Sequence, residues 1–225
     1  MVVAIDGTVC SGKSTIARLL AQRLGFVYCN TGAIYRAVTL KIFKENLQNA
    51  TEDEICEMIG RTSITQRLGE DGKQKVYLDG EDVSDEIRTP FISEQTPHYA
   101  KLPKLRDSVR GFQRECAKDA DCVVEGRDIG TVVFPNAEFK LFMSASLDVR
   151  ALRRSADYVK LGKPKQIEDV KAEIIARDKE DMEREVSPLK IDESYIVYDN
   201  SGSDIEAVLT ELSTMVLEKK SQLNK

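Results

Sequence analysis

Residues 7–15 read Gly7-Thr8-Val9-Cys10-Ser11-Gly12-Lys13-Ser14-Thr15, which matches the phosphate-binding pattern G-x-x-x-x-G-K-[ST]. The apolar residues 2–5 come before this stretch and are typical of a buried strand. Residues 13–24 follow, with apolar side chains at helical spacing and Gly25 as a C-terminal stop. A glycine-rich loop between a strand and a helix is the context in which this motif works, so the sequence predicts a nucleoside triphosphate site.

The residue types of this loop suit the chemistry of phosphate binding. Gly7 and Gly12 allow the backbone to curl so that successive N–H groups face a phosphate chain. The N-terminus of the following helix adds partial positive charge. We expect Lys13 to reach the β- and γ-phosphates of a nucleoside triphosphate and the Ser14 hydroxyl to be a ligand for Mg²⁺.

The composition is that of an ordinary globular protein, with 41% hydrophobic and 32% charged residues among 225. A net charge of −5 argues against nucleic acid as a partner, and no apolar run is long enough to span a membrane. The five cysteines have no C-x-x-C spacing and the chain opens on a strand, not a signal peptide, so we expect a cytoplasmic location. The one histidine, His98, lies between Pro97 and Tyr99 without a partner for a catalytic triad.

Short apolar segments alternate with helical patterns along most of the chain. This alternation predicts an α/β fold in which a doubly wound parallel sheet is flanked by helices. The five predicted strands lie at residues 2–5, 26–28, 121–125, 139–143 and 194–198.

Polar residues follow these strands at the edge where open α/β folds bind their ligands. The strand at 26–28 leads into a helix that carries Arg36, one turn from its start. Glu125 ends the strand at 121–125, and Asp128 follows closely, so both carboxylates are candidates to hold Mg²⁺ or its waters. We therefore expect a second anion site close to the phosphate loop.

Residues from about 37 to 100 differ in character from the rest of the chain. The stretch Thr51-Glu52-Asp53-Glu54 is a capping box that opens a short helix. Residues 63–68 and 74–78 are strand-like and flank a glycine-containing turn, and Thr89-Pro90 is typical of a helix start. The sequence thus predicts a small antiparallel sheet inserted into the parallel α/β core.

A helix is expected after Ser146, which is a suitable N-cap, and Gly162-Lys163-Pro164 should stop it. Its apolar side chains recur at helical spacing, which predicts that they form the packing face. These residues are Val149, Leu152, Ala156 and Val159.

The helix predicted at residues 167–185 carries one continuous stripe of side chains. The stripe is apolar in its first half, through Ile167, Val170 and Ile174. In its second half Arg177, Asp181 and Arg184 take over the packing positions, which suggests a surface that closes over an anionic ligand. An Arg–Asp–Arg set joined by i,i+3 and i,i+4 ion pairs is the other interpretation, and the two are compatible.

Arginines gather at the predicted ligand edge and on the helices near it, although the whole chain is acidic. One arginine suffices for simple hydrolysis, so this number suggests two phosphorylated ligands held together. A phosphate monoester acceptor is largely dianionic at pH 7 and needs no general base, which fits the near-absence of histidine. The arginines are Arg36, Arg106, Arg127, Arg153, Arg154, Arg177 and Arg184.

The chain resembles the bacterial cytidylate (CMP) kinases of the nucleoside monophosphate kinase family. The matching segments occur in the same order along the whole chain and include the long insert. Besides residues 4–15 they are Thr31-Gly32-Ala33-Ile34-Tyr35-Arg36, residues 80–89, residues 125–135, residues 150–154 and the stripe of Arg177, Asp181 and Arg184.

The resemblance implies transfer of the ATP γ-phosphate to CMP and dCMP, with Mg²⁺ as the metal. It assigns the CMP phosphate to Arg36, Arg127 and Arg177, with Thr31 beside them. It assigns the sugar to Asp181, and the cytosine edge to Arg106 and Asp128. Arg154 and Arg184 would be lid arginines close to the transferring group, and Lys13 completes the catalytic set.

The sequence departs from the family pattern at two positions. Asn30 stands where the family usually has aspartate, and Pro97 stands at the position of a base-contacting serine, for which Thr96 is the substitute. These departures leave a UMP or AMP kinase of the same fold as an alternative, and a regulatory P-loop ATPase as a more distant one. We expect one monomeric P-loop kinase domain over residues 1–225, with a nucleotide-binding insert at about 37–100 and a lid at about 153–185.

Overall fold

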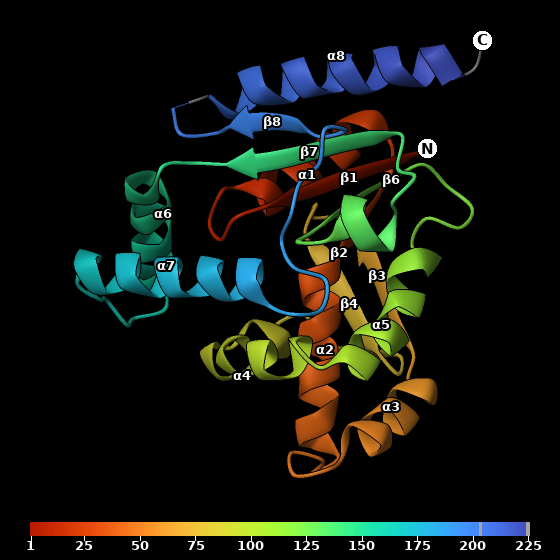
Figure 1. Cartoon of the computed structure of the whole chain (residues 1–225), viewed down its shortest axis with the longest axis vertical. Coiled ribbons are helices and arrows are strands. Elements are labelled where there is room, and N and C mark those ends of the chain that lie inside the picture. The colour runs from red at the N-terminus through yellow and green to blue at the C-terminus, as the bar shows by residue number, and fades with distance from the viewer. Residues whose placement is uncertain (203, 224–225) are drawn as a thin grey trace. The chain divides into compact units, whose positions relative to one another are not determined.

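The computed structural model describes residues 1–202 and 204–223, and within them the main sheet has five strands in the order β2-β6-β1-β7-β8 (Figure 1). β1 pairs in parallel with β7, and β7 pairs in parallel with β8. The predicted parallel α/β sheet is therefore confirmed. The strands are β1 Val2–Gly7, β2 Val27–Asn30, β6 Cys122–Gly126, β7 Phe139–Ser144 and β8 Ile196–Asp199.

The burial of the strands follows their sequence patterns. β6 is buried at every position, as expected for an apolar strand in the interior of a parallel sheet. β7 instead alternates, with Phe139, Leu141 and Met143 buried and the residues between them partly exposed. The inner strands β6 and β7 thus differ, since β6 is buried on both faces and β7 mainly on one.

The chain forms two compact units. The first consists of Met1–Gly25 and Val123–Lys225, and the second of Phe26–Cys122. The phosphate loop and the charged stripe predicted at 167–185 both belong to the first unit. The second unit contains the small sheet that the sequence predicts as an insert.

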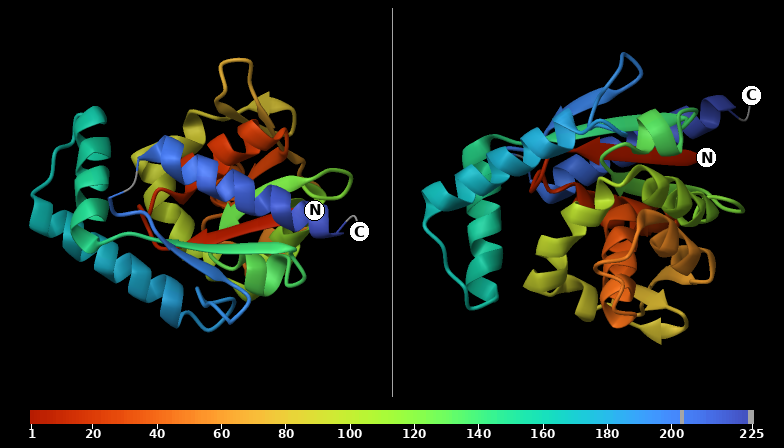
Figure 2. Two further views of the ribbon diagram at one scale, coloured as in Figure 1. Left: turned by 90° about the horizontal axis from the view of Figure 1, so that it is seen from above. Right: turned by 60° about the horizontal axis from the view of Figure 1, so that its bottom comes forward.

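The first unit contains four α-helices within its described residues. Gly25 ends the first of them in a left-handed conformation, with φ of 68°, as a glycine C-cap does. The last helix lies alongside β8 (Figures 1 and 2). The helices are α1 Lys13–Leu24, α6 Leu147–Lys160, α7 Ile167–Glu183 and α8 Ile205–Leu223, all within the described residues.

The predicted packing face of α6 is wrong. Leu152 is 64% exposed and Val159 is 63% exposed, whereas Ala151 is fully buried. The physical reason is that α6 packs against α7 and not against the sheet, so the side that bears Ala151 and Tyr158 is the inner one. Figures 1 and 2 show α6 and α7 as neighbouring helices beyond the carboxyl end of β7.

The second unit combines helices with an antiparallel sheet in the order β3-β4-β5. Ile64 pairs with Leu78 and Leu68 with Gln74, so the glycine-containing turn lies where the sequence predicts it. The capping box at Thr51 is confirmed, because its side chain and that of Glu54 bond each other's backbone N–H groups. The elements are α2 Thr31–Lys44, α3 Glu52–Gly60, β3 Ile64–Leu68, β4 Gln74–Leu78, β5 Glu81–Asp82, the 3-10 helix η1 Glu86–Arg88, α4 Pro90–Ala100 and α5 Pro103–Glu115.

Candidate active site

The phosphate loop joins the end of β1 to the start of α1 and has an unusual backbone. Gly12 has a φ of +90°, and a side chain there would crowd the amide of Asn200. A Cβ atom on Gly7 would overlap the carbonyl of Met143 on the neighbouring strand. Cys10 has a φ of 58°, which is the left-handed region that non-glycine residues seldom adopt. The two glycines of the motif are therefore required by the geometry of the loop.

The loop contains polar side chains suited to an anionic ligand. The hydroxyls Thr8 Oγ1 and Ser11 Oγ are buried and make no hydrogen bond within the part of the chain that the structure describes. Lys13 is buried as well, and its Nζ donates to the Thr8 carbonyl at 3.0 Å. Unpaired buried hydroxyls are costly in a folded protein, so their presence around a lysine fits a site for phosphate oxygens.

Burial, together with the positive charge of Arg127, lowers the pKa of Lys13 from its ordinary 10.5 to about 8. The carboxylates of Glu125 and Asp181 oppose this shift. The nearby carboxylates therefore do not fully offset the loss of hydration of the Lys13 amine and the charge of Arg127. An ATP phosphate would supply further negative charge and favour the protonated amine.

The carbonyl groups of the loop are held from outside. Ser11 O accepts hydrogen bonds from Arg153 Nη1 at 3.0 Å and from Asn200 Nδ2 at 2.9 Å. Arg153 Nη2 also donates to Asn200 O at 2.7 Å, so α6 and the end of β8 brace the loop together. The position of Arg153 near the ligand edge was predicted from the sequence. A role for Asn200 was not, because the sequence showed only that this residue follows a strand.

Asp6, the residue before the loop, is a second buried anchor. Its carboxylate accepts the N–H groups of Ile129 at 2.8 Å and Gly130 at 2.9 Å, and the Tyr195 hydroxyl at 2.7 Å. Burial raises the pKa of Asp6 to about 6, against the opposing effect of these donors. Ile129 and Gly130 open the π-helix η2 Ile129–Val133, so Asp6 fixes the segment that directly follows Asp128.

A cluster of opposite charges lies where the residues after β6 meet α7 and its C-terminal end. Asp181 Oδ2 accepts from Arg127 Nε at 2.8 Å, and Asp181 Oδ1 lies 3.5 Å from Arg177 and 3.6 Å from Arg184. Arg184 is also 3.7 Å from Asp128. Within the first unit the structure thus brings together five of the predicted site residues.

Asp181 is the common partner of the arginines in this cluster. Burial raises the pKa of Asp181, but the guanidinium groups of Arg127 and Arg177 outweigh it and hold that pKa below its ordinary value. Asp181 is therefore ionised at neutral pH. The three guanidinium groups face three carboxylates, because Glu180 pairs with Arg177 at 3.2 Å and Asp128 lies near Arg184. The i,i+3 and i,i+4 pairs of the sequence-based alternative are present, and they are compatible with an anion site.

Arg154 lies on α6 close to the phosphate loop. Its guanidinium stands 4.6 Å from the centre of the Tyr158 ring, and it donates to the Tyr158 hydroxyl at 3.3 Å. Burial raises the pKa of the Cys10 thiol, and the charges of Arg154 and Lys13 act against that shift. Arg154 is thus near enough to Cys10 to act on the charge of the loop.

The remaining predicted site residues belong to the second unit. Asn30 caps α2, accepting the Ala33 N–H at 2.9 Å, and Thr31 is the first residue of the helix. Arg106 is buried on α5, donates to the Ala100 carbonyl at 2.7 Å and stands 5.3 Å from the centre of the Tyr35 ring. Arg36, one turn into α2, is partly buried.

Thr96 and Pro97 lie in α4. The Thr96 hydroxyl donates to the Ile92 carbonyl at 2.7 Å, which leaves its oxygen free to accept one further hydrogen bond. Pro97 is inside the helix and supplies no backbone N–H. His98 is exposed on the same helix, as expected for a residue outside the chemistry.

No group of three or more His, Cys, Asp or Glu side chains that could hold a metal ion occurs among residues 1–202 and 204–223. Mg²⁺ characteristically keeps several waters and binds through one or two protein oxygens together with substrate phosphates. The exposed Ser14 at the start of α1 fits such a shared arrangement.

All five cysteines are free thiols. In the described part of the chain, no helix has the length and apolarity needed to cross a membrane.

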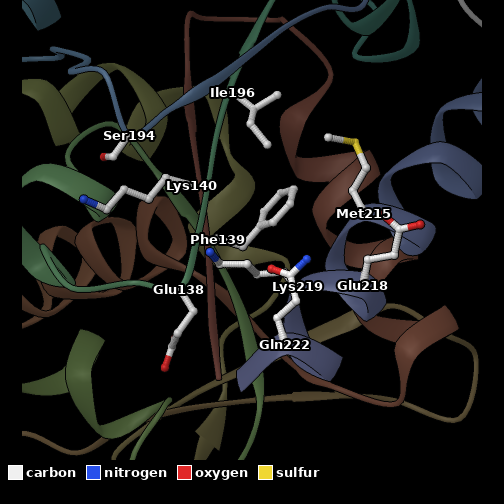
Figure 3. A pocket seen from close by; sticks show the side chains of 9 residues that line it. All are labelled: Glu138, Phe139, Lys140, Ser194, Ile196, Met215, Glu218, Lys219 and Gln222. Carbon is white, nitrogen blue, oxygen red and sulfur yellow. The ribbon is translucent and has the colours of Figure 1, made fainter. Parts of the chain in front are cut away.

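A separate hollow of about 260 Å³ lies between β7, β8 and α8 (Figure 3). Lysine and glutamate side chains from both the sheet and the helix mix there with Phe139, Ile196 and Met215. Its lining residues all lie outside the predicted site.

A buried lysine in a glycine-rich loop between β1 and α1, on a parallel sheet, defines a P-loop α/β protein. An uncharacterized protein from Eubacterium ventriosum has a similar fold, with a TM-score of 0.51 at 12% identity over 97% of this chain and 98% of that one. The family model for cytidylate kinase matches residues 3–218. The chain belongs to the cytidylate kinase family.

Curated relatives agree with that assignment over nearly the full length of both chains. Cytidylate kinase from Lactobacillus johnsonii is 40% identical over 220 residues, which are 98% of this chain and 95% of that protein. The one from Caldanaerobacter subterraneus subsp. tengcongensis is 44% identical over 207 residues, or 92% of this chain and 90% of that protein. The one from Thermotoga maritima is 40% identical over 218 residues, or 96% and 97%.

Proposed function

We propose that this protein transfers the γ-phosphate of ATP to CMP, giving CDP and ADP, and that dCMP is also an acceptor. Family membership supports the reaction class and ATP as donor. One observation carries the assignment to this site: the buried Lys13 of the phosphate loop has the Arg127–Asp181 pair beside it, in the same unit. A lysine for the donor phosphates and an arginine cluster for a second anion are the two elements that phosphoryl transfer between nucleotides needs.

The roles of the residues follow from the family resemblance and from their surroundings. Residues 7–15 bind the phosphates of ATP. The catalytic set neutralises charge on the transferring group and comprises Lys13, Arg127, Arg154, Arg177 and Arg184. The acceptor nucleotide contacts Thr31, Arg36, Thr96, Arg106, Arg127, Asp128, Arg177 and Asp181.

No general base is required by this mechanism. The second pKa of a phosphate monoester is near 6, so the acceptor is already a nucleophile at neutral pH. The guanidinium groups around Asp181 hold that acceptor and stabilise the charge that develops in transfer. Arg127 is partly buried and paired with Asp181, and is therefore held before substrate arrives, which lowers the cost of reorganisation.

The Ser14 hydroxyl is the residue that would hold Mg²⁺, together with phosphate oxygens and water. The metal would neutralise charge on the β- and γ-phosphates. Lys13 places its own positive charge at the same phosphates.

We further propose that residues 1–225 act as one monomeric P-loop kinase, in which about 37–100 bind the monophosphate and about 153–185 form a lid. Closure of such a lid would exclude water and suppress hydrolysis of ATP. The five free thiols favour a reducing compartment, which supports a cytoplasmic location.

The test is production of ADP from ATP and Mg²⁺ with CMP, dCMP, UMP or AMP offered separately, together with chromatographic detection of the diphosphate product. We expect fast turnover with CMP and dCMP, and negligible ADP when no acceptor is present. Preference for UMP or AMP would contradict the roles of Arg106 and Asp128 in base recognition. Hydrolysis independent of any acceptor would contradict the kinase assignment.

A further inference from the structure

Val9, in the phosphate loop, is held on three sides by the α6–α7 helix pair. Its N–H donates to Asp178 Oδ1 on α7 at 3.0 Å, and its carbonyl accepts from Arg150 Nη1 on α6 at 3.2 Å. Its side chain packs against the apolar cluster that contains Ala151 and Ile174. Every part of this one residue is therefore bound by elements far away in the sequence.

Asp178 and Arg150 also pair with each other across the two helices, and each side chain is only 11% exposed. Placing two charges away from water costs several kcal/mol per ion in general, and a close pair recovers that cost only with good geometry and further hydrogen bonds. Such a pair is weak evidence for stability and better evidence for a specific geometry. Here the geometry that it fixes is the backbone of Val9.

Holding the Val9 carbonyl also sets the direction of the Cys10 N–H, because the two groups belong to one planar peptide unit. In a trans peptide unit the C=O and the following N–H point in opposite directions. Arg150 holds the Val9 carbonyl, and Arg153 holds the Ser11 carbonyl at 3.0 Å, both from α6. The N–H groups of Cys10 and Gly12 are thereby turned away from α6, to the side from which a phosphate chain can approach.

We propose that Asp178 is a positioning residue, which with Arg150 couples the α6–α7 pair to the phosphate loop through Val9 and so sets the affinity for the donor nucleotide. The proposal rests on the proposed function only in that the loop binds ATP. Asp178 does not itself contact the nucleotide. Any movement of α6 relative to α7 would separate the two charges and release Val9.

The first test is the affinity of the full-length Asp178→Asn protein for ATP with Mg²⁺, measured by calorimetry without any acceptor. Asparagine keeps an acceptor for the Val9 N–H but loses the charge that holds Arg150. We expect binding about tenfold weaker, the loss typical of one hydrogen bond to a charged group. If Asp178 acted only as a negative charge near the phosphates, its removal would tighten binding, so an unchanged or stronger affinity overturns the proposal.

Asp169→Asn is the matched control, since it makes the same charge change at an exposed position on α7. Its affinity for ATP should equal that of the wild type. Hydrogen exchange of residues 7–13 supplies a second readout, which a general loss of stability would not confine to the loop. Exchange there should be faster in Asp178→Asn and unchanged in Asp169→Asn.

A double variant, Arg150→Met with Asp178→Leu, covers the case in which an unpaired buried arginine prevents folding. Apolar replacement of a buried pair usually preserves stability. We expect this protein to fold, to exchange rapidly in the loop and to bind ATP weakly. Wild-type affinity in a folded double variant would refute the coupling. Both readouts are independent of CMP, so failure of CMP phosphorylation alone would leave this inference standing.

Discussion

Arg127 Nε lies 2.8 Å from Asp181 Oδ2, which joins the segment after β6 to the charged half of α7. The burial of Asp181 and its closeness to Arg177 and Arg184 make it the centre of a three-arginine cluster. One carboxylate thus holds guanidinium groups that would otherwise repel one another. Asp128 and Glu180 add one carboxylate each to the outside of the cluster, beside Arg184 and Arg177.

Asp181→Asn should lower the free energy of unfolding by about 3 kcal/mol, since it leaves buried arginines without their shared partner. The excess positive charge of this variant should bind anions more strongly. Inorganic phosphate is therefore expected to raise the melting temperature of the variant more than that of the wild type. Both quantities can be measured by thermal unfolding with and without phosphate.

Glu180→Gln is the matched control for this prediction. Glu180 pairs with Arg177 at 3.2 Å, but its side chain is 46% exposed, and exposed pairs contribute about 0–1 kcal/mol. The control should thus unfold almost like the wild type and respond equally to phosphate. Equal losses in the two variants would argue against Asp181 as the centre of the cluster.

ATP binding should be linked to proton uptake by Lys13. With a pKa of about 8 in the free protein, Lys13 is about half protonated at pH 8, and phosphate would restore its full charge. Binding at pH 8 should therefore take up about half a proton, and affinity should fall as the pH rises above 8. Calorimetry in buffers of different ionisation enthalpy measures this uptake.

Two comparisons isolate the lysine in that experiment. At pH 6 the Lys13 amine is already protonated in the free protein, so its contribution to uptake should vanish. Lys13→Arg carries a permanent charge and should show no lysine-linked uptake at pH 8, whatever its affinity. Identical uptake by the wild type and Lys13→Arg would exclude Lys13 as the group that titrates.

The pKa of Asp6 predicts a specific pH dependence of stability. Because burial raises this pKa from 3.8 to about 6, the folded protein binds a proton between these values that the unfolded chain has already lost. The contribution of Asp6 to stability is therefore greatest at low pH and falls as the pH rises through this window, by about 3 kcal/mol in total. Above about pH 6 it should be constant.

Asp6→Asn removes this titration. The difference in the free energy of unfolding between wild type and variant, measured by denaturant titration from pH 4 to pH 7, should follow the Asp6 curve. At neutral pH the variant should still be less stable, since its amide would oppose one of the N–H groups of Ile129 and Gly130. A difference that does not change with pH would show that Asp6 titrates normally.

Local sequence signals predicted much of this molecule. The phosphate loop, the capping box at Thr51 and the stripe through Ile174 and Asp181 each depend on residues within a few positions of one another, so their spacing carries the information. The parallel sheet was predicted by the same logic, because alternating strands and helices permit few arrangements, whereas the order of its strands was not predicted.

Contacts between distant residues could not be predicted in this way. The hydroxyl of Tyr195 bonds Asp6 across 189 positions, and Asp178 bonds Val9 across 169. Nothing in the neighbouring sequence of either pair signals its partner. The packing face of α6 was missed for a related reason: Leu152 has a suitable apolar spacing, but the helix packs against α7 and leaves it in solvent.

Pro97 gives the last prediction, because a serine is usual at this position in the family that the chain resembles. Pro97→Ser should lower the KM for CMP by about two- to tenfold, the effect of one added hydrogen bond. It should also restore a backbone N–H inside α4, where proline is unfavourable.

Pro97→Ala restores the N–H without the hydroxyl and is the matched control, so its KM for CMP should stay at the wild-type value. The measurement is the steady-state KM of the three proteins for CMP and for UMP. Equal KM values for the serine and alanine variants would show that position 97 does not contact the base.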